Sequence, residues 1–247
     1  MDTANRTPHQ QLADAATELS VWDLSGPVLA LVPHADDETL GCGGLLAALY
    51  QANIPVDVLL VTDGTQSHPN STSHDADQRR DVREQELRDA VEALGGTASR
   101  VLFWRKPDTQ VPPVDSPFGK TAVTELLGYL TAGDYRTVLT PYRHDPHGDH
   151  EATTALLDLA VLQLGAPLTV LQYLVWLGHQ GEAPWPSPDR FEIRRFAVDA
   201  ALRSKKQAAL AAHRSQFGDV FEGPGFTLPS HLTATVDRPF ELYLTDK

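Results

Sequence analysis

The stretch Val28–Gly44, VLALVPHADDETLGCGG, is the part of the sequence around which the predicted fold is arranged. It begins with the apolar run Val28–Val32, which is typical of a strand that is buried on both faces. One histidine and three carboxylates then follow between His34 and Glu38. So much negative charge at the end of a buried strand is costly unless a positive charge lies among it. The simplest such charge is a divalent metal ion.

The composition is that of an ordinary globular protein. The chain has 247 residues, 41% of them hydrophobic, and a mean hydropathy of -0.27. Its 33 acidic and 20 basic side chains give a formal charge of -13, which argues against nucleic acid and anionic membranes as partners. The single cysteine, Cys42, excludes an internal disulfide and fits a reducing cytosol. Since the sequence has neither a signal-like segment nor a long apolar run, we expect a cytoplasmic protein without stable membrane insertion.

Strands alternate with helices along the chain after a polar lead-in over residues 1–26. The predicted strands lie at 28–32, 56–62, 100–104, 137–140, 168–177 and 191–198, with strand character again at 233–244, and the predicted helices at 41–52, 77–94, 121–130, 150–164 and 200–213. This alternation indicates right-handed βαβ units. The predicted fold class is therefore α/β: a single Rossmann-like domain over 1–247, with a mostly parallel sheet flanked by helices.

A second polar cluster, Pro141–His150 (PYRHDPHGDH), also follows directly on a predicted strand. Because parallel sheets bind ligands at the carboxyl ends of their strands, both clusters are expected on the same rim. Together they offer His34, Asp37 and His150, a two-histidine, one-carboxylate set that suits a catalytic zinc. His150 would begin a helix, whose positive dipole end keeps the imidazole neutral. Asp36 would be free to act on a bound water.

The two clusters match motifs of a known family. Pro33–Glu38 resembles the signature [AP]-H-P-D-D-E, and His147–His150 resembles the later motif H-P-D-H. Further matches in the same order are Thr62–Gly64, Arg83 with Glu86, and Lys206 with His213–Gln216. Over roughly residues 27–220 the chain thus resembles the PIG-L/LmbE family of zinc-dependent N-deacetylases. Ala35 and Gly148 stand where the family has prolines, so both loops are expected to be less rigid.

The resemblance implies a metal-dependent amide hydrolysis. The substrate would be a small N-acetylglucosamine-type sugar or glycoconjugate, which is cleaved to a free amine and acetate. His34, Asp37 and His150 would hold Zn²⁺, although Fe²⁺ and Co²⁺ suit the same ligands. The metal would polarise the amide carbonyl and lower the pKa of its water. Members of the family are often multimeric, so a homo-oligomer is compatible with the resemblance.

The resemblance also implies roles for the remaining motif residues. Asp36 would be the general base. His147, oriented by Asp149, would support the oxyanion or share the acid role. Family motifs and positions at strand ends give four candidate substrate contacts: Arg83, Asp63, His213 and His144.

Two other functions stay open at this point. The same ligands would serve another metal hydrolase, such as a phosphoesterase or an amidase on non-sugar substrates. A metal-dependent carbohydrate-binding protein without catalysis is the third hypothesis, against which Asp36 argues because binding needs no free carboxylate. We expect substrate specificity to depend on the loops 65–76, 105–118 and 178–190, about which the motifs give no information. Trp176 lies inside a predicted strand and is expected in the core.

Overall fold

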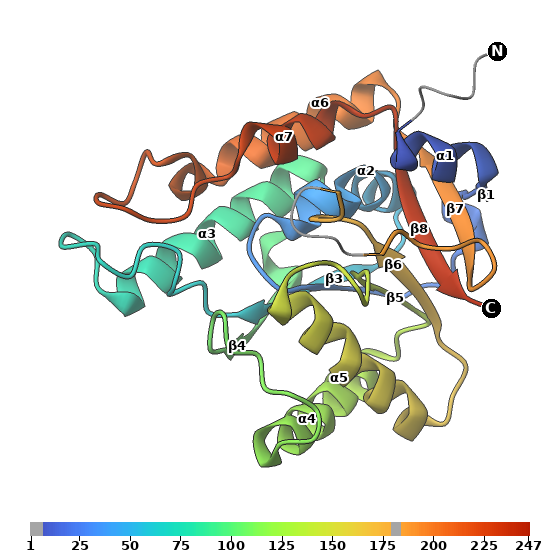
Figure 1. The fold of residues 1–247 in the computed structure, drawn as a ribbon, viewed down its shortest axis with the longest axis horizontal. Helices are drawn as coiled ribbons and strands as arrows, with labels where there is room; N and C mark the ends of the chain where they lie inside the picture. The colour runs from blue at the N-terminus through green and yellow to red at the C-terminus, as the bar shows by residue number, and fades with distance from the viewer. Residues whose placement is uncertain (1–6, 179–183) are drawn as a thin grey trace.

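One sheet of eight strands runs through the computed structural model, which describes residues 7–178 and 184–247 (Figure 1). The strands are β1 (Thr17–Glu18), β2 (Val28–Val32), β3 (Val56–Thr62), β4 (Val101–Lys106), β5 (Thr137–Pro141), β6 (Thr169–Tyr173), β7 (Phe191–Ala197) and β8 (Phe240–Asp246). Their order in the sheet is β1-β7-β8-β6-β5-β2-β3-β4. Only β8 runs antiparallel to its neighbours, β6 and β7. The predicted α/β class with a mostly parallel sheet is confirmed.

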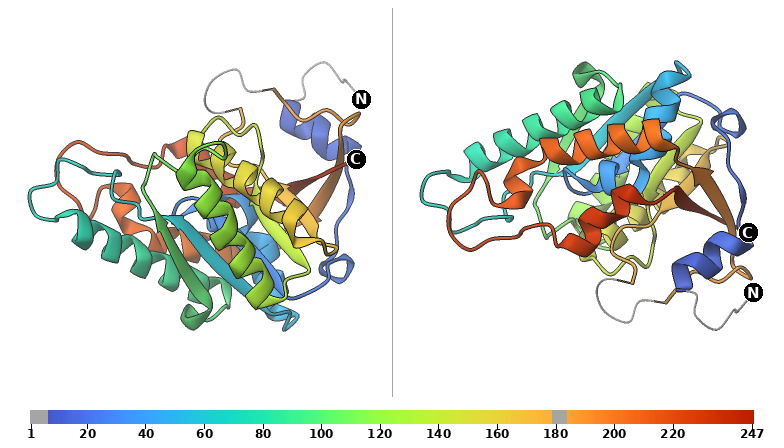
Figure 2. Two further views of the ribbon diagram at one scale, coloured as in Figure 1. Left: turned by 90° about the horizontal axis from the view of Figure 1, so that it is seen from below. Right: turned by 90° about the horizontal axis from the view of Figure 1, so that it is seen from above.

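Helices cover both faces of this sheet. The α-helices are α1 (Pro8–Ala15), α2 (Asp37–Gln51), α3 (Ala76–Leu94), α4 (Pro117–Gly133), α5 (Gly148–Leu164), α6 (Ala200–Ala212) and α7 (Ser230–Thr233). Short 3₁₀ turns are η2 (Val21–Asp23), η3 (Ala98–Arg100), η4 (Arg214–Phe217) and η5 (Ala234–Asp237). Helices α2, α3 and α6 lie on one face and α4 and α5 on the other (Figures 1 and 2). This layering explains why the central strands are apolar throughout.

Strand β2 shows how the apolar run fits between the two helical layers. Val28, Ala30 and Val32 belong to the core cluster that includes buried residues of α2, α3 and α6. Leu29 and Leu31 point the other way, into the cluster beneath α4 and α5. All five side chains are fully buried, as expected for a strand at the centre of a doubly covered sheet.

The chain changes direction in the sheet between β2 and β5. From β2 it proceeds through β3 to β4, and it then returns to place β5 on the other side of β2, with Val28 opposite Thr137. Open α/β sheets bind ligands in the crevice at such a switch point, outside the carboxyl ends of the strands. The segments after β2 and β5 are the two polar clusters of the sequence.

Helix α2 begins at Asp37, four residues before the predicted start. The glycines from Gly41 onward lie inside the helix, as the predicted range 41–52 implies, and neighbouring groups approach them closely. A Cβ atom on Gly41 would lie 2.2 Å from the Cδ2 atom of Tyr173, and one on Gly44 would lie 2.7 Å from Val198. These glycines allow α2 to pack against β6 and the end of β7.

Two predicted strands are shorter than expected. Strand β6 ends at Tyr173 because the chain then leaves the sheet, and the N–H of Trp176 donates to Asp145 at 2.9 Å. The tail forms helical turns over 230–237 before β8 begins. The lead-in, for which the sequence predicts an irregular or partly helical structure, contains α1 and also a two-residue strand, β1, which was not predicted. Of the predicted loop 178–190, residues 179–183 lie outside the described residues.

None of the helices in the described ranges combines the length and apolar character that crossing a membrane would require. Cys42 is a free, fully buried thiol in α2. The cytoplasmic location, the domain limits and a homo-oligomer stay predictions.

Candidate metal centre and active-site pocket

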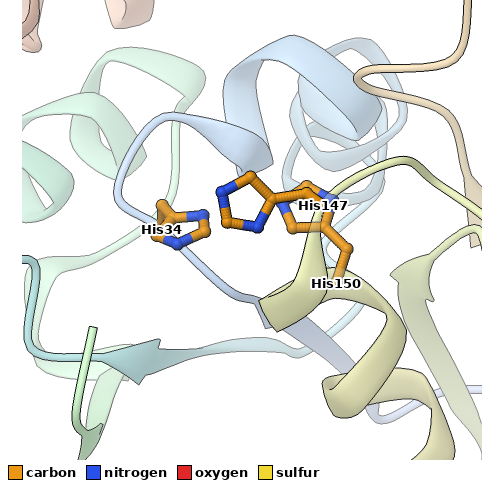
Figure 3. Close-up of side chains that lie close together, drawn as sticks. All are labelled: His34, His147 and His150. Atoms are coloured by element: carbon orange, nitrogen blue, oxygen red, sulfur yellow. The ribbon is translucent and has the colours of Figure 1, made fainter. Parts of the chain in front are cut away.

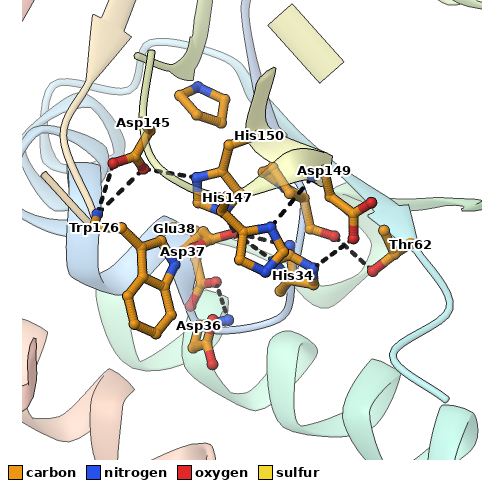
Figure 4. Close-up of polar contacts among 12 residues, drawn as sticks. His34, Asp36, Asp37, Glu38, Thr62, Asp145, His147, Asp149, His150 and Trp176 are labelled. Atoms are coloured by element: carbon orange, nitrogen blue, oxygen red, sulfur yellow. Dashed lines mark hydrogen bonds and ion pairs between the residues drawn. The ribbon is translucent and has the colours of Figure 1, made fainter. Parts of the chain in front are cut away.

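Two ring nitrogens and one carboxylate oxygen converge at the carboxyl ends of β2 and β5. The Nδ1 atom of His34 lies 3.3 Å from Oδ2 of Asp37, and the Nε2 atom of His150 lies 3.1 Å from the same oxygen. His34 is in the turn after β2, Asp37 opens α2, and His150 is in the first turn of α5. The structure thus brings the three residues predicted as metal ligands together from two distant segments (Figure 4).

In His34 and His150, the ring nitrogen that does not face Asp37 lies against another carboxylate. Nε2 of His34 lies 3.1 Å from Oδ2 of Asp149, and Nδ1 of His150 lies 2.8 Å from Oδ2 of Asp145. A carboxylate partner favours the proton on the nitrogen that faces it and leaves the lone pair of the neutral ring on the other nitrogen. In both rings that other nitrogen faces Asp37.

This donor set fits a four-coordinate divalent metal. At ligand distances of about 2.0–2.2 Å, tetrahedral donors lie roughly 3.3–3.6 Å apart, close to the two nitrogen–oxygen distances given above. The Nε2 atom of His150 is buried and has no hydrogen-bond partner within the described residues. A buried polar atom without a partner is costly, and a metal ion would satisfy it. We therefore take His34, Asp37 and His150 as the candidate metal site.

The electrostatics of the cluster favour a positive charge. Burial lowers the pKa of His150, but Asp37 and Asp145 outweigh burial and raise it to about 9. Burial raises the pKa of Asp37, yet His150 and His34 hold it well below its usual range. In the metal-free protein, ring protons supply positive charge that a bound metal would replace.

His147 is a third imidazole at the same place (Figure 3). It is the N-cap of α5, and one nitrogen from each of His34, His147 and His150 lies within 4.8 Å of the others. Burial and the other two rings lower the pKa of His147 to about 4, so the ring is neutral near pH 7. Its Nδ1 accepts the backbone N–H of Asp149 at 3.3 Å, which leaves the ring proton on Nε2. His147 thus offers a neutral N–H donor beside the donor set.

The contact of Asp149 with the His147 ring is made by its backbone N–H, whereas the Asp149 carboxylate faces His34. It is bonded to His34 and accepts the backbone N–H groups of Thr109 and Val111 at 2.8 and 3.0 Å. The physical reason is that the loop after β4 lies against the start of α5, and its buried N–H groups need an acceptor. Asp149 therefore joins this loop to the candidate metal site.

Asp36 places a carboxylate next to the donor set without being part of it. The side chain is buried, and its Oδ2 lies 3.6 Å from Nη2 of Arg83. Burial raises the pKa of Asp36 to about 7, although Arg83 acts in the opposite direction. Arg83 itself donates from Nη2 to the carbonyl of Ala35 at 2.6 Å, and its buried Nε has no partner among the described residues.

A pocket of about 160 Å³ opens over these groups. Its polar lining comes from the candidate site and from the loops after β3 and β4, and its apolar lining comes from α2, the segment after β6 and the C-terminal loop. The lining residues are His34, Asp36, Asp37, Leu40, Gln66, Ser67, Arg83, Asp108, Thr109, His147, Trp176, Gln216, Phe226 and Leu228. Trp176 is buried as predicted, but it also forms part of this wall.

Of the four predicted substrate contacts, only Arg83 lines the pocket. Asp63 instead accepts hydrogen bonds from Thr65 and from the N–H of Asp108, so it shapes the neighbouring loops. His144 packs edge-on against the ring of Tyr142. His213 is fully buried behind Glu38, 2.8 Å from its Oε1. Position at a strand end or in a motif does not reveal which way a side chain faces.

The structure adds residues that the sequence analysis did not single out. Asp145 anchors His150, and Asp108 lies 3.5 Å from Nε2 of His34. Asp145 falls inside a polar cluster and could have been found as the carboxylate five residues before His150. Asp108, Phe226 and Leu228 come from irregular loops, in which the sequence carries no periodic pattern that assigns them to a pocket.

The fold and the site together define a class: an α/β protein with a histidine- and carboxylate-lined candidate metal centre at the switch point of its sheet. Comparison with known proteins gives the family. The PIG-L model, described as GlcNAc-PI de-N-acetylase, matches residues 29–161, and the chain belongs to this family. The family resemblance seen in the sequence is thereby confirmed.

Relatives and solved structures show what the chain is similar to. It is 27% identical over 192 residues to a probable N-acetyl-alpha-D-glucosaminyl L-malate deacetylase 2 of Bacillus cereus, covering 76% of this chain and 83% of that protein. A teicoplanin deacetylase in its zinc-inhibited form matches with a TM-score of 0.66 and 19% identity, over 89% of this chain and 98% of the other. The 4-carboxy-2-hydroxymuconate hydratase of Pseudomonas putida matches with a TM-score of 0.62 and 17% identity, over 89% and 95%. The last two likenesses show the fold alone.

Proposed function

We propose that this protein is a zinc-dependent N-deacetylase that hydrolyses the N-acetyl amide of an N-acetylglucosamine-type substrate to an amine and acetate. The observation that carries the proposal is the pair of ring nitrogens of His34 and His150 that face one oxygen of Asp37, beside the carboxylate of Asp36. Two findings support it: the chain belongs to the PIG-L family, and it is similar to a probable N-acetyl-alpha-D-glucosaminyl L-malate deacetylase 2.

His34, Asp37 and His150 would hold the metal. Zinc, when bound, would lower the pKa of a water molecule and polarise the amide carbonyl. Zinc suits two imidazoles and one carboxylate, as do Fe²⁺ and Co²⁺. Asp145 and Asp149 fix the orientation of the two rings, which is the usual task of carboxylates around a metal site.

Asp36 would move the proton. Its carboxylate lies in the pocket next to Asp37, where burial raises its pKa to about 7. A base with a pKa near the working pH both accepts a proton from the attacking water and gives it up again. Asp36 would pass that proton to the departing nitrogen, so that the amide C–N bond breaks with a neutral amine as the leaving group.

His147 would stabilise the oxygen of the amide as it gains negative charge. The ring is neutral and carries its proton on Nε2, as the hydrogen bond at Nδ1 indicates. A neutral donor that is fixed before the reaction lowers the barrier without further reorganisation. The Arg83 guanidinium lines the same pocket and would contact a substrate oxygen there.

The test combines metal content with turnover. Wild type is expected to contain about one zinc per chain by elemental analysis and to release acetate from an N-acetylglucosamine derivative. His150→Ala should lose the metal, whereas Asp36→Asn and His147→Ala should retain it and lose about 100-fold or more in kcat. His144→Ala, outside the pocket, is the matched control and should keep both.

The substrate panel separates this proposal from the other metal-hydrolase hypothesis. It contains N-acetylated sugars, non-sugar amides and phosphate esters. Turnover confined to phosphate esters, or full acetate release by Asp36→Asn, would contradict the proposal. Metal binding with tight sugar binding but no turnover on the whole panel would favour the carbohydrate-binding alternative.

A further inference from the structure

Asp36 has a backbone conformation that residues other than glycine rarely adopt. Its φ is 142° and its ψ is -26°, a region in which an L side chain is strained. Such a conformation persists only where the surroundings hold it. Because Asp36 is the proposed general base, the groups that hold its peptide also determine where its carboxylate lies.

Glu38 holds the Asp36 peptide on one side. The Asp36 N–H donates to Oε2 of Glu38 at 3.0 Å, and the Asp36 carbonyl accepts the N–H groups of Thr39 and Leu40 at 3.0 and 2.9 Å. The Glu38 side chain is fully buried. The Glu38 carboxylate therefore keeps its hydrogen bond from the Asp36 N–H without competition from water, provided that something fixes the carboxylate itself.

His213 fixes the Glu38 carboxylate from a distant part of the chain. The Nε2 atom of His213 lies 2.8 Å from Oε1 of Glu38, and the hydroxyl of Thr39 donates to the same oxygen at 2.5 Å. His213 directly follows α6, is fully buried and is not among the residues that line the pocket. It therefore reaches Asp36 through Glu38 and not through the substrate.

We propose that His213 is a positioning residue for the deacetylation reaction. It fixes the Glu38 carboxylate, which holds the strained Asp36 peptide so that the Asp36 carboxylate points into the pocket. This inference rests on the proposed function, because it takes Asp36 as the general base. It gives the late histidine motif a role other than the substrate contact expected from the sequence.

The test compares two substitutions of His213. In His213→Gln the amide nitrogen takes the place of Nε2 and can still donate to Glu38, whereas His213→Leu fills a similar volume without a donor. His213→Leu is expected to lower kcat about 10- to 100-fold, with metal content unchanged and KM changed less than about threefold. His213→Gln should recover most of kcat.

Thr137→Val is the matched control. Thr137 is also fully buried, at the start of β5 and outside the pocket lining, and its hydroxyl donates to the carbonyl of Ser25 at 2.7 Å. This variant should lose stability without the loss of kcat. If His213→Leu does not fold, His213→Asn, whose shorter side chain cannot span the distance to Glu38, takes its place.

Hydrogen exchange of the backbone amides of Asp36, Thr39 and Leu40 gives a readout that needs no activity. Exchange there should rise in His213→Leu, and it should stay at the wild-type level in His213→Gln and Thr137→Val. An inactive wild type with this exchange pattern would sink the proposed function and leave the role of His213 in place. An active wild type, with His213→Leu equal to Thr137→Val in kcat and in exchange, would overturn the positioning role.

Discussion

Asp36 combines a buried position, which favours the protonated carboxyl group, with a proposed role as a base, which requires the ionised one. Its carboxylate is buried beside Asp37, and the cation nearest to it, Arg83, lies 3.6 Å away. In water the group would ionise near its ordinary pKa of 3.8, whereas burial raises the pKa to about 7 in the folded, metal-free protein. The two values define a pH window in which only the unfolded chain is ionised.

The raised pKa of Asp36 makes the folded protein lose stability as the pH rises through this window. A group whose folded-state pKa is raised gives stability that is fully present below the unfolded pKa and is lost as the pH rises to the folded pKa. We therefore expect the free energy of unfolding of metal-free wild type to fall, relative to Asp36→Asn, between about pH 4 and pH 7. Urea unfolding of both proteins with a chelator present measures this difference, because the other titrating groups are shared. A difference that stays constant over this range would mean that Asp36 is ionised throughout.

At the scale of the elements, helix α5 begins in a way that accommodates the proline of the family motif. Gly148 is its first residue, a position at which proline is favoured, and a Cβ atom there would meet nothing within 4 Å. The preceding residue, His147, has φ -142° and ψ 123°, which is the conformation that a following proline requires. Glycine at position 148 therefore makes the unfolded chain more flexible, whereas the folded turn keeps the conformation that a proline would give it.

We expect Gly148→Pro to stabilise the protein by about 0.4–1 kcal/mol, because it restricts the unfolded chain without straining the folded one. For a chain of this size the melting temperature should rise by roughly 1–4 °C. Thermal unfolding at one pH and metal concentration measures it, with Gly165→Pro as the comparison. Gly165 has φ +63°, which proline cannot adopt, so that variant should be destabilised. A lower melting temperature for Gly148→Pro would show that the folded turn does not accept the ring.

At the scale of the whole molecule, two loops from distant parts of the chain form one side of the pocket. The carboxylate of Glu222 accepts hydrogen bonds from Ser71, Thr72 and Ser73, and the N–H of Phe226 donates to the carbonyl of Ser67 at 2.7 Å. The loop after β3 and the loop after η4 are thereby joined. Both contribute lining residues to the pocket, as Ser67 and Phe226 themselves show.

Breaking this connection should affect substrate binding more than chemistry. We expect Glu222→Ala to raise KM about threefold or more with kcat nearly unchanged, because the pocket wall loses its fixed position while the candidate metal site is untouched. Steady-state kinetics measures it, and limited proteolysis within residues 65–76 should be faster. Asp219→Ala removes an exposed carboxylate from the same loop and serves as the control. Equal KM values for the two variants would argue against a role for the connection.

The sequence predicted most of the sheet and the candidate metal site because both depend on local patterns. Buried strands such as β2 read as apolar runs, and His34, Asp37 and His150 follow directly on strands whose carboxyl ends must meet. The walls of the pocket could not be predicted in this way. Phe226 and Leu228 are placed by contacts between irregular loops, and no periodicity encodes such contacts.

The direction in which side chains point is a second feature of the site that the sequence does not predict. His213 belongs to a recognisable motif, yet the motif does not say whether the ring faces the pocket or the core, and the structure places it fully buried. Asp149 likewise sits beside His147 in sequence but bonds His34 and the loop after β4, because α5 begins at Gly148 and turns the carboxylate toward that loop. Both outcomes depend on packing between segments far apart in the chain.

The order of the elements along the chain has a consequence for biosynthesis. The proposed metal ligands all lie before residue 151, whereas His213, Gln216, Phe226 and Leu228 belong to the last 35 residues of the sequence. During translation the donor atoms therefore leave the ribosome well before the segments that hold Asp36 and close the pocket. Under the proposed function, turnover would therefore have to wait for the C-terminal segment. The topology of the chain thus separates the synthesis of the proposed metal ligands from the completion of the pocket.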